Sequence, residues 1–280
     1  MVNFAGVNFK NRVTLASGTC GFGREVSEYY DLSLLGGICT KGLTLRPRLG
    51  NAPPRTAETP FGMLNSVGLQ NPGVEAFIRD ELPFLRGFDT KIIANFSGES
   101  PEEFARVATL LAEAGVDMLE VNISCPNLHA GGLAFGVDAT AAAEVTRAVK
   151  EVAGTVPVMV KLTPNVTDIA AIAIACEKAG ADALSLINTL LGMRFDLKSG
   201  KPALANITGG LSGPAILPVA LRCVWQVAQA VKLPLMGMGG ISDVDTAREM
   251  LLAGATLLSI GTAQFKNPLV AIEIVRQLDS

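Results

Sequence analysis

The sequence predicts an α/β protein, a (β/α)8 TIM barrel with long loops over its C-terminal face, in which residues 1–280 form a single domain. Eight short apolar runs alternate with longer segments of helical period along almost the whole chain. The mean hydropathy of +0.38 is high, as expected when helices bury both faces of parallel strands. A doubly wound sheet is the alternative, but it more often has about five or six strands in a shorter domain.

The predicted strands are residues 13–17, 37–40, 91–96, 118–123, 158–162, 183–187, 235–238 and 257–261. N-capping side chains at the start and a glycine at the end predict three helices. One opens at Ser100 and stops at Gly115, one opens at Thr167–Asp168 and closes at Gly180, and one opens at Ser242–Asp243 and closes at Gly254. Two connections, 42–86 and 188–214, are longer than a βα loop requires. Loops of this length on a barrel usually shape an active site or a partner surface.

The composition excludes several classes of protein. The 23 basic and 26 acidic residues give a net charge of −3, so we expect no nucleic-acid partner. No apolar stretch reaches the roughly 18 residues of a membrane span, and the first residues do not resemble a signal peptide. We therefore expect a cytoplasmic protein. The five cysteines form no CxxC pair and His129 is the single histidine, so we expect no metal site.

Polar residues follow several of the predicted strands. Binding and catalytic groups of a barrel lie at the C-terminal ends of its strands. A lysine there either points into the barrel mouth or extends to solvent, and two lysines accompanied by asparagines favour a ligand site. The residues concerned are Ser17, Lys41, Gly42, Asn95, Asn122, Lys161, Asn188 and Thr189.

Two glycine turns follow the last two strands. Gly239–Gly240 precede a predicted helix, and Gly261–Thr262 form a similar turn. Backbone N–H groups and a helix N-terminus can bind an oxyanion, and barrels commonly bind phosphate after strands seven and eight. The two turns favour a phosphate-bearing ligand. The first predicted strand has no GxGxxG after it, so a dinucleotide bound in the Rossmann mode is not supported.

Cys125 lies just beyond the fourth predicted strand. A thiol at this place can be a nucleophile or a general base, or it can fill apolar space, the interpretation that we give to Cys39, Cys176 and Cys223. No His–Asp pair accompanies Cys125, and we interpret His129 as a solvated loop residue. Papain-like covalent catalysis is therefore disfavoured.

Four segments resemble signature segments of the dihydroorotate dehydrogenases, and in particular of the catalytic subunits of the class 1B, NAD-linked enzymes of pyrimidine biosynthesis. They occur in the same order across nearly the whole chain. The class 2 relatives have serine in place of Cys125. The segments are TKGLT (40–44), ETPFGMLNSVGLQN (58–71), NISCPN (122–127) and MGG (238–240).

The resemblance implies an FMN across the barrel mouth, with its phosphate at Gly239, Gly240, Gly261 and Thr262. By the family pattern, Lys161 would lie near the pyrimidine edge of the flavin, where a cation favours the negative charge that reduction creates. The other implied FMN contacts are Ser17, Lys41, Gly42, Asn95, Asn122, Ile187 and Gly213.

The resemblance also implies the substrate and the chemistry. Cys125 would accept a proton from C5 of dihydroorotate while C6 delivers a hydride to FMN, which gives orotate. The implied substrate contacts are Lys41, Asn65, Ser66, Val67, Gly68, Leu69, Asn122, Asn127, Asn188 and Thr189.

A partner is implied in the same way. Class 1B enzymes pass electrons to NAD through a second subunit that carries FAD and a [2Fe–2S] cluster, and the resemblance implies a homodimer of this chain within a heterotetramer. Two enzyme alternatives are a class 1A homodimer that uses fumarate and a dihydropyrimidine dehydrogenase that acts on uracil. Lys41, as a carboxylate partner, favours orotate over uracil. A phosphate-ligand barrel without catalysis is the non-enzyme alternative.

Overall fold

The computed structural model describes residues 1–124 and 135–278 and has the predicted (β/α)8 architecture. Eight parallel strands close into a barrel in the order β10-β15-β16-β3-β4-β7-β8-β9, so each pairs with the next barrel strand along the chain. They are β3 (Val13–Leu15), β4 (Gly37–Cys39), β7 (Lys91–Phe96), β8 (Met118–Asn122), β9 (Val158–Lys161), β10 (Ala183–Leu186), β15 (Leu235–Met238) and β16 (Leu257–Ile260).

The eight strand predictions are confirmed, although six of the predicted runs extend one or two residues too far at the C-terminal end. Several of those extra residues still donate a backbone hydrogen bond to the neighbouring strand, as Thr40 does to Ile93 and Leu162 does to Ser185.

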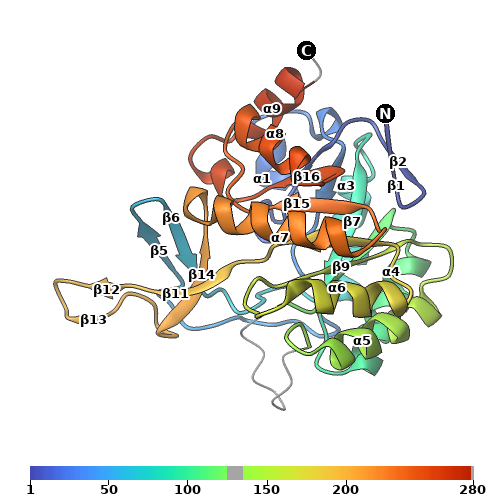
Figure 1. The fold of residues 1–280 in the computed structure, drawn as a ribbon, viewed down its shortest axis with the longest axis horizontal. Helices are drawn as coiled ribbons and strands as arrows, with labels where there is room; N and C mark the ends of the chain where they lie inside the picture. Colours follow the sequence, from blue (N-terminus) through green and yellow to red (C-terminus); the bar gives the residue numbers. More distant parts are fainter. Residues whose placement is uncertain (125–134, 279–280) are drawn as a thin grey trace.

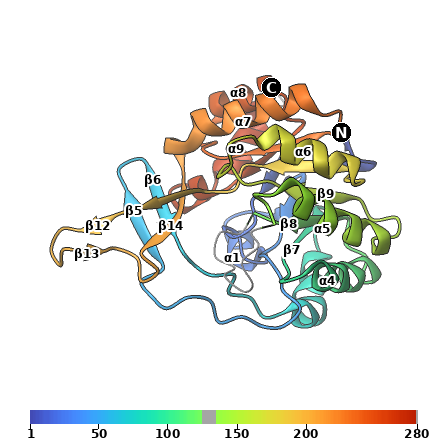
Figure 2. The same cartoon turned by 60° about the horizontal axis from the view of Figure 1, so that its bottom comes forward.

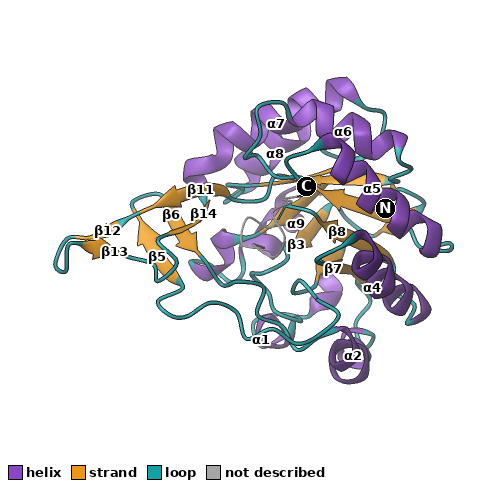
Figure 3. Ribbon diagram, turned by 90° about the horizontal axis from the view of Figure 1, so that it is seen from below, coloured by secondary structure: helices purple, strands orange, loops and turns teal. Residues whose placement is uncertain are grey.

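Helices cover the outside of the barrel (Figure 3). The three predicted helices are present, and their N-caps Ser100, Asp168 and Asp243 each accept a hydrogen bond from a backbone N–H of the first turn. The longer helices are α4 (Pro101–Glu113), α5 (Ala139–Val152), α6 (Ile169–Lys178), α7 (Leu217–Ala230), α8 (Val244–Leu252) and α9 (Val270–Leu278). Within residues 1–124 and 135–278, no helix has the length and apolar character that crossing a membrane requires.

Short helical segments occupy the remaining connections. They are α1 (Arg24–Ser27), η1 (Leu32–Leu34), α2 (Val74–Ala76), the π-helical η2 (Phe77–Glu81), α3 (Leu82–Leu85), η3 (Pro214–Ile216) and η4 (Thr262–Phe265).

An N-terminal hairpin, β1 (Val2–Phe4) with β2 (Val7–Phe9), closes the other end of the barrel. The rings of Phe4 and Phe9 meet edge to face with centroids 6.1 Å apart. Both rings are buried in one cluster with residues near the strand starts, among them Met118 and Leu257. The barrel is therefore filled with apolar side chains at its N-terminal end, and a ligand can enter only from the C-terminal end.

The two long connections meet in one antiparallel sheet, which we call the cap sheet (Figure 1). It has the order β11-β14-β6-β5 and extends beyond the ring of helices on one side, as does the hairpin of β12 and β13 (Figure 2). Its central pairing joins Asn65 to Gly210, which are far apart in the sequence. The strands are β5 (Thr56–Thr59), β6 (Gly62–Asn65), β11 (Leu190–Met193), β12 (Phe195–Asp196), β13 (Lys201–Pro202) and β14 (Thr208–Ser212).

Candidate active site

A cavity of about 240 Å³ lies where the C-terminal ends of the barrel strands meet the cap sheet. Most of the residues that the sequence predicts for the site share its lining. They are Ser17, Lys41, Gly42, Asn65, Val67, Gly68, Leu69, Asn95, Asn122, Lys161, Ile187, Asn188, Thr189, Gly213, Gly239, Gly240, Gly261 and Thr262.

Of the other three predicted residues, only Ser66 belongs to the part of the chain that the structure describes. Ser66 is buried outside the cavity lining, and its hydroxyl accepts hydrogen bonds from Asn51 Nδ2 at 3.0 Å and from Asn206 Nδ2 at 3.2 Å. Its side chain therefore stabilises the turn after β6 and does not face the cavity. Cys125 and Asn127 lie outside the described residues, so their roles stay predictions from the sequence.

The turn at Gly239–Gly240 needs glycine at both positions. The φ angles are +116° and +84°, and a Cβ at Gly240 would lie 2.6 Å from Leu217 Cβ. Among the described residues, no acceptor takes the backbone N–H of either glycine. Two N–H groups at the edge of the cavity are thus available to an anion.

The helix after this turn contributes less than the sequence suggests. The Asp243 side chain accepts from the Thr246 N–H at 2.8 Å, and Thr246 Oγ1 accepts from the Asp243 N–H at 3.1 Å. The hydrogen bond from the Thr246 backbone lowers the pKa of Asp243, so this residue is an anion at neutral pH. An anionic cap offsets part of the positive end of α8, so the helix that the sequence predicts beside the turn has less positive charge to offer an anion.

The second turn differs from the first. Gly261 has a negative φ of −112°, and a Cβ there would meet its nearest neighbour, Ala16 Cβ, at 3.6 Å, which is ordinary contact. The Thr262 hydroxyl donates to Ser212 Oγ at 2.7 Å. This hydrogen bond ties the turn after β16 to the cap sheet.

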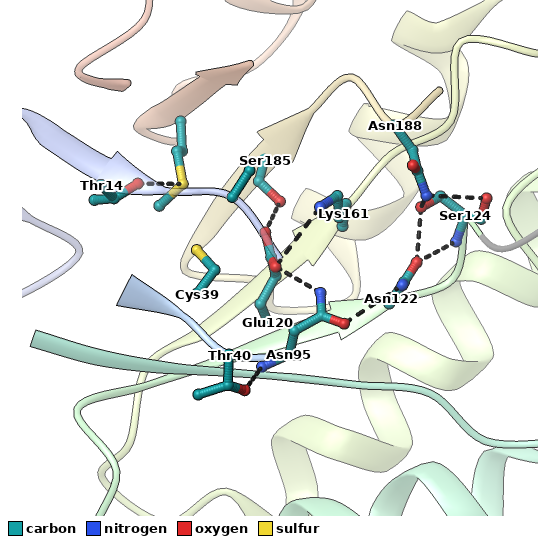
Figure 4. Close-up of polar contacts among 12 residues, drawn as sticks. Thr14, Cys39, Thr40, Asn95, Glu120, Asn122, Ser124, Lys161, Ser185 and Asn188 are labelled. Carbon is teal, nitrogen blue, oxygen red and sulfur yellow. Dashed lines mark hydrogen bonds and ion pairs between the residues drawn. The ribbon is translucent and has the colours of Figure 1, made fainter. Parts of the chain in front are cut away.

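A buried ion pair lies at the base of the cavity (Figure 4). Lys161 on β9 is only 4% exposed, and its Nζ is 3.9 Å from Oε2 of Glu120 on β8, which is fully buried. The same oxygen accepts from Asn95 Nδ2 at 2.5 Å, and Oε1 accepts from Ser185 Oγ at 2.7 Å. Lys161 therefore points into the barrel, as one of the two alternatives for a strand-end lysine predicts.

Asparagine side chains continue this network along the rim of the cavity (Figure 4). Asn122 Nδ2 donates to Asn95 Oδ1 at 3.4 Å, and Asn122 Oδ1 accepts from the Ser124 hydroxyl at 2.8 Å. Ser124 Oγ in turn accepts from Asn188 Nδ2 at 2.7 Å, and Asn188 Oδ1 accepts from the Thr189 N–H at 2.8 Å. The amide groups are thus held in defined orientations before any ligand binds.

The described cysteines behave as apolar residues. Cys20, Cys39, Cys176 and Cys223 are buried free thiols, which confirms the interpretation given to the last three. Burial raises the pKa of Cys20 to about 12 and that of Cys176 to about 11. None of these four thiols is therefore ionised at neutral pH, and none is suited to act as a base there.

Sequence reasoning missed the polar residues of the barrel interior, above all Glu120. The signal was available, because a glutamate in the middle of the strand MLEVN breaks an otherwise apolar run. Ser185 and Ser212 were missed as well, since serine carries little pattern information in a strand.

The fold and the lining together define a (β/α)8 barrel with a polar cavity and a glycine turn suited to an anion. Residues 1–280 match the dihydroorotate dehydrogenase family model. The chain is similar to curated proteins named "Dihydroorotate dehydrogenase B (NAD(+)), catalytic subunit". It is 55% identical over 278 residues to that of Alkaliphilus oremlandii, covering 99% of this chain and 92% of the relative.

Other relatives with the same name are equally similar. The protein of Caldicellulosiruptor bescii is 53% identical over 279 residues, with 100% of this chain and 92% of the relative covered. That of Bacillus pumilus is 54% identical over 278 residues, with 99% and 89% covered. The chain therefore belongs to the dihydroorotate dehydrogenase family.

Proposed function

We propose that this chain is the catalytic subunit of an NAD-linked dihydroorotate dehydrogenase, an oxidoreductase that converts (S)-dihydroorotate to orotate in pyrimidine biosynthesis. The names of relatives about 55% identical over nearly the whole chain support this activity. The single observation that carries it is the cavity that gathers Lys41, Lys161, the asparagines and the glycine turns at the C-terminal end of the barrel. Residues 1–280 would form one FMN-binding domain.

The residues of the cavity fit FMN. A dianionic phosphate needs backbone donors that it can approach closely, and the turn at Gly239–Gly240 offers N–H groups with no side chain in the way. Thr262 can add its backbone N–H from the neighbouring turn, while its hydroxyl donates to Ser212. The flavin ring is uncharged when oxidised, and amide groups such as Asn95 can satisfy its polar edge.

Lys161 is the residue that suits a flavin acting as electron acceptor. When bound, FMN supplies the group that accepts the hydride from C6 of the substrate. A buried ammonium beside the ring stabilises the negative charge that reduction creates, because a charge is little screened where water is excluded. The ion pair with Glu120 holds this ammonium at the base of the cavity.

The substrate would lie on the side of the cavity formed by the cap sheet. Asn65, Asn122, Asn188 and Thr189 offer amide and hydroxyl groups that match the ring amides of dihydroorotate, and Lys41 offers a cation for its carboxylate. Asn127 would add a further contact, and Val67, Gly68 and Leu69 border the same space. Cys125 would take the proton from C5 as a general base.

Electrons would leave through a partner. The relatives are named as catalytic subunits of NAD(+)-linked enzymes, which supports a second subunit. We propose that this partner carries FAD and a [2Fe–2S] cluster and joins a homodimer of this chain in a heterotetramer. The cysteines described in this chain are dispersed and buried, so such a cluster is assigned to the partner.

The decisive experiment is the visible spectrum of the purified chain, before and after anaerobic addition of substrate. We expect a bound flavin that dihydroorotate bleaches and dihydrouracil does not. Bleaching by dihydrouracil alone would make the chain a dihydropyrimidine dehydrogenase. A colourless protein that binds no FMN would support the non-catalytic alternative. Turnover with fumarate but without a partner protein would place the chain in class 1A.

A further inference from the structure

Glu120 is a buried carboxylate for which the proposed chemistry has no direct use. It lies beneath the cavity, in the centre of β8, and does not belong to the lining. Removing a carboxylate from water is costly, and an apolar residue of similar size usually gives an equally stable core. Fold stability alone therefore does not account for a glutamate here.

The contacts of Glu120 join two lining residues. Oε2 accepts from Asn95 Nδ2 and faces the Lys161 ammonium, while Oε1 accepts from Ser185. Lys161 and Asn95 both line the cavity. A change at Glu120 is thus transmitted to the ligand site through two side chains.

The carboxylate also fixes the orientation of Asn95. An ionised carboxylate can only accept hydrogen bonds, so Asn95 must present its NH2 group to Glu120 and its Oδ1 on the opposite side, toward Asn122. The backbone N–H of Ser124 can only donate, and it donates to Asn122 Oδ1 at 3.2 Å. Glu120, which can only accept, and the Ser124 N–H, which can only donate, lie at the two ends of this chain of hydrogen bonds. Both ends therefore require the same orientation of the Asn95 and Asn122 amides.

Glu120 is the anion that faces Lys161 in the part of the chain that the structure describes. The thiols of Cys20 and Cys39 on the neighbouring segments also interact electrostatically with Lys161. Burial raises the pKa of both thiols, that of Cys20 to about 12, so both remain neutral. The Lys161 ammonium thus depends on Glu120 for its charge balance before a ligand binds.

We propose that Glu120 is a positioning residue of the flavin site: its carboxylate offsets the charge of Lys161 and directs the Asn95 carboxamide oxygen toward the rim. This inference rests on the proposed function, because Lys161 and Asn95 are assigned there to FMN. It adds that a residue that does not touch the flavin helps to set its midpoint potential.

Glu120→Gln tests the charge alone. Glutamine has the same shape, can turn its oxygen toward Asn95, and can donate to Ser185, whose hydroxyl can reverse. The variant removes the negative charge that lies 3.9 Å from Lys161 Nζ. The positive charge of Lys161 is then no longer offset, which favours the reduced, negatively charged flavin, so the midpoint potential of the variant should lie above that of the wild type.

The measurement is the midpoint potential of bound FMN in the wild type and the variant at neutral pH. We expect the potential of the variant to be higher by about 30 mV or more, which is a tenfold change in relative affinity for reduced and oxidised FMN in a two-electron couple. General loosening of the site would shift the control variant, Ser185→Ala, by a similar amount.

Ser185→Ala is the matched control, because it removes one hydrogen bond from the same carboxylate and leaves the charge in place. Its midpoint potential should equal that of the wild type. If Glu120→Gln does not fold, Glu120→Asp draws the charge back from Lys161 and should give a smaller change of the same sign. A folded Glu120→Gln variant whose potential equals that of the wild type overturns the proposal. Wild-type protein that binds no FMN overturns the proposed function instead.

Discussion

The two ends of one barrel are built from the same strands and have opposite chemistry. At the N-terminal end Phe4, Phe9 and Met118 fill the interior with apolar atoms. At the C-terminal end the inward positions of the same strands carry Asn122 and Lys161, and the interior opens into a cavity. Met118 and Asn122 lie on a single strand, four residues apart. A barrel therefore separates stability from ligand binding along its axis, and each end can be tested alone.

Phe9→Ala should have the largest effect, and on stability only. It removes a fully buried ring from the apolar end, which costs about 3–5 kcal/mol in the free energy of unfolding. Urea unfolding followed by circular dichroism measures it. FMN affinity of the folded variant should equal that of the wild type, because the polar end is unchanged.

Phe9→Leu is the control for this end, since it keeps an apolar side chain and should cost about 1.5 kcal/mol or less. Weaker FMN binding by folded Phe9→Ala, under conditions where the apoprotein is native, would mean that the two ends are coupled.

Cys125→Ser should have the next largest effect, on rate alone. Serine is a much weaker base at neutral pH, and general-base catalysis typically contributes about 10²- to 10⁴-fold. We expect anaerobic reduction of the flavin by dihydroorotate to slow about 100-fold or more, with FMN retained. Stopped-flow absorbance of the flavin measures this rate.

Cys176→Ala is the matched control. Its thiol is buried on α6, and burial raises its pKa to about 11, so it should contribute nothing to reduction. Equal rates in Cys125→Ser and the wild type would remove Cys125 from its role as base.

The sequence predicted the barrel because its signals are local. Each strand is a short apolar run, and N-caps such as Ser100 and Asp243 mark helix starts within three or four residues. The cavity followed from the rule that strand ends converge, which placed Lys161 and the asparagines together. The family resemblance added Ile187 and Gly213, which have no distinctive chemistry of their own.

The parts that escaped prediction depend on contacts between distant segments. The cap sheet forms because β14 pairs with β6, and nothing in either loop alone specifies Asn65 opposite Gly210. The hairpin with Phe4 and Phe9 is short, and its role follows only from the barrel end that it fills. To predict the role of Glu120, one would have to know that its side chain points into the barrel, beside Lys161.

Gly240→Ala should affect both properties to a moderate degree. The new Cβ meets Leu217 Cβ at 2.6 Å and the φ of +84° is unfavourable for alanine, so we expect a loss of about 1–2 kcal/mol in stability. The turn must shift, so FMN affinity should fall about tenfold or more, measured by quenching of FMN fluorescence. Gly261→Ala is the stability control, because its Cβ has room, and it should change unfolding by about 0.5 kcal/mol or less.

Asp243→Ala should have the smallest effect, at the open end but outside the cavity. Loss of the N-cap of α8 costs about 1 kcal/mol at neutral pH. The folded pKa of Asp243 is lowered, chiefly by the hydrogen bond from the Thr246 backbone. The stabilisation from its charge is therefore complete above the unfolded pKa of about 3.9 and is lost as pH falls through the lower, folded value. Urea unfolding at a series of pH values should show the difference from the wild type shrinking below about pH 4. A difference that grows on acidification would contradict this sign, and weaker FMN binding by the variant would show that the capped helix, and not only the turn at Gly239–Gly240, contributes to the phosphate site.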